Sequence, residues 1–182
     1  MDIIYKYRIH IVVALIFVLV IIGLFNLSAK AGNRPTYQDV TSSDILNGTY
    51  QVWQGEVSAN FKNGKAEDKT AHISSSIDQS ALGDINGDKI RDGLAIITTA
   101  RGDSMDELFV IFKQNNILQT KALDIPLTKG NTVRNIRKVT INQDRTIDLE
   151  LDILAPNDPH CCASLHGIHR YKFQNNQLVL IK

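Results

Sequence analysis

The chain has 182 residues, of which 43% are hydrophobic and 21% are charged, and its formal net charge is +1. This length suits one domain of ordinary size. The near-zero net charge leaves no basic footprint for nucleic acid, which we therefore exclude as a partner. Four prolines and 11 glycines argue against a fibrous or low-complexity chain, and two cysteines are too few for a disulfide-rich scaffold.

The first 31 residues differ in character from the rest. Residues 11–25 form an uninterrupted apolar run, and the 19 residues from Ile9 to Leu27 come close to the roughly 20 that a helix needs to cross the hydrocarbon core. Lys6 and Arg8 precede the run, and cations on this side keep the amino terminus in the cytoplasm. The sequence therefore predicts one N-terminal transmembrane or signal helix within residues 1–31, with the membrane as its partner.

Two fates of this segment stay open. It can remain as a signal anchor, which makes the chain a single-pass membrane protein. Alternatively it is cleaved after Ala31, because Ala29-Lys30-Ala31 fits a small-x-small cleavage site. Either fate places residues 32–182 outside the cytoplasm, in the periplasm or at the cell surface, and cleavage releases them as a secreted protein.

Residues 32–46 are expected to form a linker with one helical turn over 39–46, followed by an extracytoplasmic domain over 47–182. In that domain, short stretches of alternating polar and apolar residues recur between turn signals, as is typical of β-strands. The continuous apolar run at 94–100 indicates a central strand buried on both faces. The predicted strands cover, in chain order, residues 49–54, 56–61, 72–77, 94–100, 107–113, 117–123, 137–142, 146–154, 170–174 and 177–182.

Tight turns join most of these strands. The period-two pattern is clearest over 146–154, where apolar and acidic side chains alternate: Ile147, Leu149, Leu151 and Ile153 against Asp148, Glu150 and Asp152. No useful helical periodicity follows residue 46, and no fixed repeat indicates a propeller or solenoid. We therefore expect an all-β fold, an antiparallel meander that closes as a sandwich or a partly open barrel.

A candidate cation loop precedes the predicted central strand. Oxygen-bearing side chains stand at its positions one, three, five and nine, and the carbonyl of position seven is a further donor: Asp84, Asn86, Asp88, Asp92 and, for the carbonyl, Ile90. Hard oxygen donors at this spacing can wrap one calcium ion, and three carboxylates offset the charge of a divalent cation. We therefore predict a structural calcium ion as cofactor.

The loop departs from an EF-hand at two positions. Position twelve is Ala95, where an EF-hand needs Glu, and position six is Lys89, where Gly is usual. A non-glycine residue in the left-handed conformation costs roughly 1 to 2 kcal/mol, which lowers the expected affinity. The alternative is an Asp- and Asn-rich turn that binds no ion.

The stretch from Leu82 to Thr99 resembles the calcium loops of integrin-like FG-GAP repeats, in which such a loop leads into a buried strand. The chain also resembles uncharacterised, lipoprotein-like envelope domains of bacteria. Their pattern has an NGxY strand (here Asn47 to Tyr50), a GDxNGD loop (Gly83 to Asp88) and a late pair of cysteines (Cys161-Cys162). The resemblance covers residues 47–182 and implies an exported β-rich domain without a known reaction.

The second candidate site is a segment of ten residues with two cysteines and three histidines: His160, Cys161, Cys162, His166 and His169. Neighbouring Cα atoms lie 3.80 Å apart, below the usual range for a disulfide, so a bond between the two cysteines would be strained and easily reduced. Unpaired or intermolecular thiols are the first alternative. The second is a zinc or copper site, because thiolate and imidazole ligands suit these metals.

Three classes of function follow. The leading interpretation is a non-enzymatic, membrane-anchored or exported β domain that binds an envelope protein or a glycan. The alternative is a transition-metal or thiol-redox protein that uses the His160-Cys161-Cys162 segment. A hydrolase ranks last, because no convergent acid/base set, GxSxG, P-loop or HExxH motif is visible.

Overall fold

The computed structural model describes residues 35–127 and 130–181, and Thr36–Lys182 form one compact unit. The predicted N-terminal helix within residues 1–31 lies outside the described residues. Among the residues that are described, no helix is both long enough and apolar enough to span a membrane.

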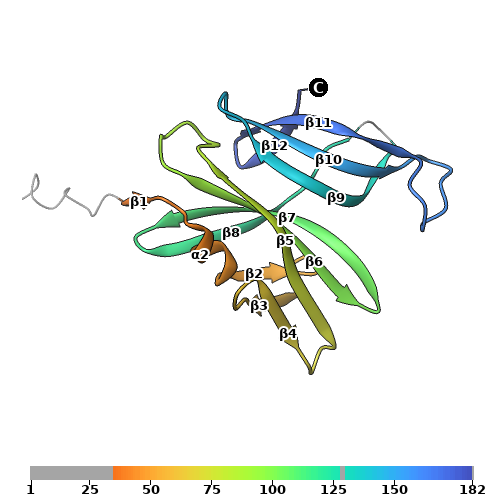
Figure 1. The fold of residues 1–182 in the computed structure, drawn as a ribbon, viewed down its shortest axis with the longest axis horizontal. Coiled ribbons are helices and arrows are strands. Elements are labelled where there is room, and N and C mark those ends of the chain that lie inside the picture. The colour runs from red at the N-terminus through yellow and green to blue at the C-terminus, as the bar shows by residue number, and fades with distance from the viewer. Residues whose placement is uncertain (1–34, 128–129, 182) are drawn as a thin grey trace, which may run out of the picture. The chain divides into compact units, whose positions relative to one another are not determined.

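Strands dominate the described part of the chain (Figure 1), which confirms the all-β prediction. The one helix there is α2 (Ser42–Leu46). The strands are β1 (Tyr37–Gln38), β2 (Thr49–Val52), β3 (Val57–Asn60), β4 (Lys65–Asp68), β5 (Ile73–Gly83), β6 (Asp92–Arg101), β7 (Asp103–Gln114), β8 (Ile117–Leu123), β9 (Thr132–Ile141), β10 (Thr146–Leu154), β11 (Leu165–Gln174) and β12 (Gln177–Leu180).

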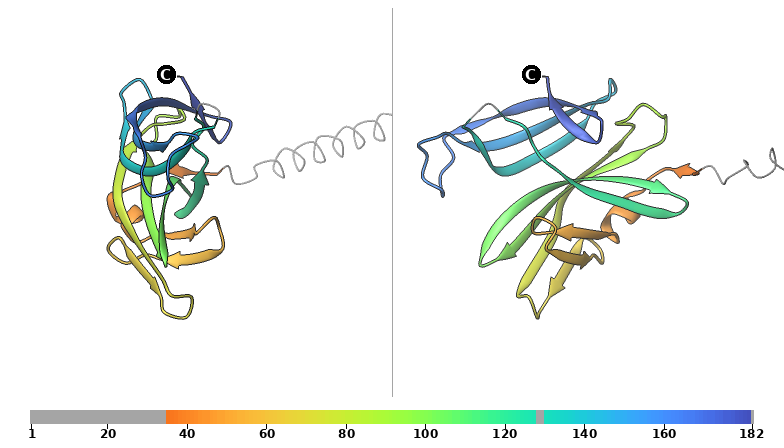
Figure 2. Two further views of the ribbon diagram at one scale, coloured as in Figure 1. Left: turned by 90° about the vertical axis from the view of Figure 1, so that its right-hand side faces the viewer. Right: turned by 180° about the vertical axis from the view of Figure 1, so that it is seen from behind.

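The strands form three sheets, and every strand pair is antiparallel. The largest sheet has the order β1-β7-β6-β5-β4, with β8 also paired to β7, and it curls into a half-barrel. The second is a meander of four strands in the order β12-β11-β10-β9, and β2 and β3 form a separate hairpin. Figure 2 shows the four-stranded sheet lying across the larger one. The antiparallel meander predicted from the turn signals is therefore present in both larger sheets.

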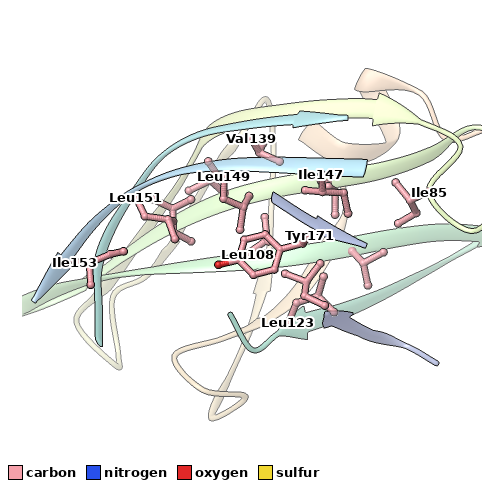
Figure 3. Close-up of a cluster of buried hydrophobic side chains, with 14 residues drawn as sticks. Ile85, Leu108, Leu123, Val139, Ile147, Leu149, Leu151, Ile153 and Tyr171 are labelled. Carbon is pink, nitrogen blue, oxygen red and sulfur yellow. The ribbon is translucent and has the colours of Figure 1, made fainter. Parts of the chain in front are cut away.

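Strand β6 lies between two hydrophobic clusters. Leu94 and Ile96 belong to the cluster shared with β9 to β12 (Figure 3), whereas Ala95 and Ile97 belong to the cluster shared with α2 and the β2-β3 hairpin. Both faces of the strand are thus covered, which is what the continuous apolar run at 94–100 predicts.

Strand β10 has the predicted alternation. Its apolar side chains point into the core, whereas Asp148 and Asp152 form ion pairs with arginine side chains on the opposite face of the sheet. Asp148 forms a bidentate pair with Arg170 (2.6 and 2.7 Å), and Asp152 accepts from Arg137 Nε (2.7 Å). These contacts lower the pKa of Asp152 to about 2, chiefly through the hydrogen bond from Arg137.

The expected linker over 32–46 is wrong from Thr36 onward, because this segment belongs to the compact unit. Val40 and Ile45 are fully buried in the core next to β6. The helical turn expected over 39–46 is present as α2, and Thr41 and Asp44 form a capping box at its start. The segment therefore contributes to the fold rather than merely leading to it.

Several strands also differ from the expectation, and β7, β9 and β11 each begin four to five residues before the predicted start. Strand β4 was not predicted, because its sequence KAED combines residues that are rare in strands. Strand β5 extends past the predicted end at residue 77 to Gly83, across a register shift between Ile77 and Gln79. This extension matters for the candidate site, because it brings Gly83 opposite Asp92.

Candidate calcium loop and cysteine pair

The candidate calcium loop closes the hairpin between β5 and β6. Gly83 and Asp92 are the last pair of that ladder, so residues 84–91 connect two paired strands. Ile85 is 3% exposed and inserts its side chain into the core (Figure 3), and its backbone N–H donates to Asp92 Oδ2 (3.1 Å). The core thus fixes the loop by a residue that lies between its polar ligands.

Three of the predicted ligands converge. One carboxylate oxygen from each of Asp84, Asp88 and Asp92 lies within 4.8 Å of the other two. Among the described residues, no other group of three or more His, Cys, Asp or Glu side chains converges in this way. Hard carboxylate oxygens around one point suit calcium, and the cluster could hold such an ion.

Hydrogen bonds from the loop backbone set the positions of these oxygens. Asp84 accepts from the N–H groups of Gly87 (2.6 Å) and Lys89 (3.1 Å). Asn86 Oδ1 accepts from Asp88 N–H (2.9 Å), and Asp88 Oδ1 accepts from the N–H of Ile90 (2.8 Å). The side chains at positions one, three and five therefore turn the chain around a common centre.

Asp92 is the carboxyl group of the loop whose charged form is disfavoured. Its side chain is buried, and burial raises its pKa to about 7, with smaller contributions from the negative charges of Asp88 and Asp84. A divalent cation between the three carboxylates would favour the charged form. The loop thus has a charge imbalance that a cation would remove.

Two backbone conformations in the loop are demanding. Gly87 has φ +90°, and a Cβ atom at this position would collide with the guanidinium of Arg145, which extends from the turn between β9 and β10. Lys89 has φ +68°, as its position in the loop led us to expect, and it carries the cost of a left-handed non-glycine residue.

One set of hydrogen bonds at the end of the loop has no signal in the sequence. The backbone N–H of Arg91 donates to Asp39 Oδ1 (2.8 Å), and Val40 N–H donates to the Arg91 carbonyl (2.7 Å). Both partners come from the segment before α2, about fifty residues away in the chain. The segment expected to be a linker therefore holds the end of the candidate calcium loop.

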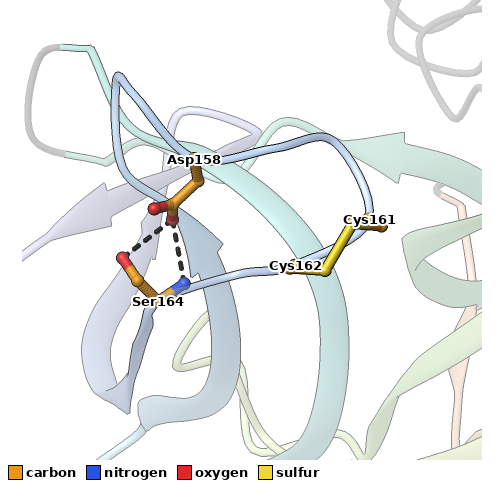
Figure 4. The surroundings of a disulfide bond; sticks show 4 residues. All are labelled: Asp158, Cys161, Cys162 and Ser164. Carbon is orange, nitrogen blue, oxygen red and sulfur yellow. Dashed lines mark hydrogen bonds between the residues drawn. A yellow bond between two sulfur atoms is a disulfide. The ribbon is translucent and has the colours of Figure 1, made fainter.

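The cysteine pair lies in the loop between β10 and β11. Cys161 and Cys162 are joined by a disulfide bond (Figure 4), and both residues are exposed. Asp158 closes the base of this loop: its Oδ2 accepts from Ser164 N–H (2.8 Å), Ser164 Oγ (2.8 Å) and Ala155 N–H (2.7 Å). These bonds hold the loop independently of the disulfide.

The three histidines do not gather around the cysteines. His160 is exposed in the loop, and His169 pairs with Leu149 across β10 and β11. His166 binds acidic groups instead, with Nδ1 3.0 Å from Asp152 Oδ1 and Nε2 3.4 Å from Glu150 Oε1. Sulfur atoms bonded to each other are also not available as thiolate ligands, so this geometry gives the soft-metal alternative no support.

We expect Asp158→Ala to loosen the cysteine loop while the rest of the domain stays folded. The backbone and side-chain donors of Ser164 and the N–H of Ala155 hold the pKa of Asp158 below its usual value. The clamp therefore persists at neutral pH and is lost only as the pH falls below the ordinary range of an aspartate. Hydrogen exchange at pH 7 should accelerate over residues 155–164 and stay unchanged in β9 and β10. Faster exchange throughout β10 would contradict a purely local role; Asp124→Ala, at an exposed position, is the control.

A separate cleft of about 830 Å³ lies beside β7 and β8, and none of its lining residues belongs to either loop. A hollow of about 470 Å³ adjoins the candidate calcium loop at Asn86 and reaches residues 173–176.

Comparison with known proteins adds no family: no family model matches the chain, and no curated protein or solved structure is significantly similar to it.

Proposed function

We propose that the protein is a non-enzymatic β domain of the cell envelope, membrane-anchored or exported, which a structural calcium ion stabilises and which acts as a binding module. The observation that supports calcium is the convergence of the Asp84, Asp88 and Asp92 carboxylates in one loop. The basic residues and apolar run within residues 1–31 support the location. The resemblance to exported β domains points in the same direction.

A structural role for the ion follows from the position of its ligands. They lie between the paired ends of β5 and β6, and Ile85 and Asp92 are buried there. An ion at this place would fix the hairpin that carries the central strand. It would add rigidity to the fold rather than present an open coordination position to a substrate.

The partner of such a module would be an envelope protein or a glycan. The cleft beside β7 and β8 is the concave surface we assign to it. Gln51, Gln54 and Asn131 line this cleft together with Lys121 and Asp124. Amide and charged side chains of this kind suit the hydroxyl groups of a glycan or the polar backbone of a peptide.

Calcium should raise the melting temperature of the full-length protein. An ion bound by the native state stabilises it by about 2.7 kcal/mol when its free concentration is 100 times Kd. For a chain of this size such a gain corresponds to roughly 5 to 10 °C. Asp88→Ala should abolish the increment because it removes one of the three converging carboxylates. Differential scanning calorimetry with calcium and with chelator measures the effect.

Asp124→Ala is the matched control, since it removes an exposed carboxylate outside the loop and should keep the full calcium response. Magnesium at the same concentration should stabilise less, because it requires near-ideal octahedral geometry. A melting curve that millimolar calcium leaves unchanged would reduce the loop to a polar turn and would remove calcium from the proposal.

A further inference from the structure

We propose that Cys161 and Cys162 form a thiol–disulfide exchange site, at which a dithiol reductant outside the cytoplasm transfers two electrons to the domain. The site is separate from the calcium loop, so the proposal stands or falls independently of calcium binding. Its basis is the combination of an exposed bond, a loop held by other contacts, and a fold that does not depend on that bond.

Access is the first requirement. Thiol–disulfide exchange begins with a thiolate that reaches one of the two sulfur atoms. Both cysteines are exposed, and so are Pro159 and His160 before them. Exposed disulfides are the labile, regulatory or catalytic ones, and this one stands at the surface of a loop between β10 and β11.

Tolerance of reduction is the second requirement. A disulfide between neighbouring residues closes almost no chain loop, so it contributes little stability through the entropy of the unfolded state. The ladder between β10 and β11 runs up to the pair Ile153 and Leu165, below the cysteine loop. Asp158 holds the base of that loop by three hydrogen bonds that do not involve sulfur. The domain can therefore change its redox state without unfolding.

The exchange balances as follows. One thiolate of the dithiol attacks Sγ of one cysteine and forms a mixed disulfide, and the other cysteine leaves as a thiolate. The second thiol of the reductant, as thiolate, then attacks the reductant's other sulfur atom, which is bonded to the cysteine in the mixed disulfide. This step releases that cysteine as a thiolate. The reductant ends as a disulfide, and Cys161 and Cys162 gain two electrons and two protons to become two thiols.

The reduced state has a different surface chemistry. Two neighbouring thiols in an exposed loop can re-form a disulfide with an oxidised partner in the reverse reaction, because the sequence keeps them side by side. The loop then passes electron pairs between partners that contain thiols or disulfides. Its specificity would come from the residues around it, among them His160 and the exposed Leu165.

Intact-mass measurement of the purified full-length protein tests the proposal. Without reductant, alkylation in denaturant should add nothing, and the mass should lie two hydrogen atoms below that of the reduced chain. Native protein treated with dithiothreitol and then alkylated should carry two adducts, while its circular dichroism and the fluorescence of Trp53 stay unchanged. The reduction rate should be of the same order of magnitude in the native and the denaturant-unfolded protein.

Single variants test whether each of the two sulfur atoms can take part in exchange. Cys161→Ser and Cys162→Ser each leave one thiol, which should form a mixed disulfide with 5,5′-dithiobis(2-nitrobenzoate) and release one equivalent of coloured thiolate. The double serine variant should be folded and inert. Two alkylated thiols in the unreduced protein would overturn the proposal, and so would a bond that dithiothreitol reduces only after the domain has been unfolded.

Discussion

Ile45→Ala is expected to lower the free energy of unfolding by about 2 to 5 kcal/mol, the usual cost of truncating a fully buried aliphatic side chain. Ile45 is 0% exposed and packs in the cluster that covers one face of β6. A Cβ at Gly93 would approach its Cδ1 to 3.1 Å, which shows how closely the side chain lies against the start of that strand. Urea unfolding followed by the fluorescence of Trp53, the single tryptophan, measures the loss.

Ile117→Ala is the matched control, since Ile117 is 61% exposed and the shorter side chain should change stability by no more than about 0.5 kcal/mol.

Two N-terminal truncations of the chain extend the test. A chain that begins at Thr36 should fold, whereas a chain that begins at Asn47 should not, because it lacks Val40 and Ile45. Equal stability of the two truncated chains would restore the interpretation of residues 36–46 as a linker.

The sequence predicts well those strands in which burial alternates or is continuous. In β10 the period-two pattern of apolar residues coincides with the inward face, and in β6 the continuous apolar run coincides with burial on both faces. Such patterns are local, because each residue's polarity indicates only whether that residue is buried. They establish fold class and the central strand, yet they leave the pairing of distant segments undetermined.

The segment 36–46 shows what local patterns miss. It is short, and it is ordered by partners far away in the chain: β1 pairs with the end of β7, and Asp44 binds Lys113 (3.0 Å) across 69 residues. Strand β4 escapes prediction for a related reason. Its alternately exposed polar residues are held by pairing with β5 rather than by any β-propensity of their own.

The candidate calcium loop could be predicted because its ligands are contiguous in sequence. Their spacing alone indicates that Asp84, Asp88 and Asp92 share a centre, and the structure brings these three together. Asp39 accepts from Arg91 at one end of the loop, and the guanidinium of Arg145 lies beside Gly87; both residues belong to other parts of the chain and carry no motif. In the cysteine loop, likewise, nothing in the sequence singled out Asp158 as the residue that holds its base.

Burial of Asp92 links the loop to the core. Asp92 is 3% exposed, and its Oδ2 accepts from the backbone N–H of Ile85 (3.1 Å), so the buried residue that anchors the loop lies directly beside this carboxylate. Exclusion of water is the chief cause of the raised pKa of Asp92. The cost of a charged Asp92 is therefore a consequence of the packing, and it should appear in the pH dependence of stability.

In chelator, the free energy of unfolding should fall as the pH rises from about 4 to about 7. Asp92 titrates near 7 in the native state and near 3.8 in the unfolded chain, so within this window the native state holds a proton that the unfolded chain lacks. One such proton lowers the free energy of unfolding by about 1.4 kcal/mol per pH unit. The aspartates whose pKa is lowered act in the opposite sense, but only below about pH 4; they are Asp44, Asp144, Asp148, Asp152 and Asp158.

Calcium should reverse this trend. The ion requires the carboxylate form, so its binding releases the proton of Asp92 and its stabilising effect should grow from pH 5 to pH 8. Asp92→Asn keeps an acceptor for the N–H of Ile85 but cannot titrate, so it should flatten the slope in chelator and weaken the calcium response. Urea unfolding at pH 5, 6, 7 and 8, with calcium and with chelator, separates these effects; Asp124→Asn should retain both. A slope in chelator that Asp92→Asn leaves unchanged would show that another group, and not this buried carboxylate, controls the stability of the loop.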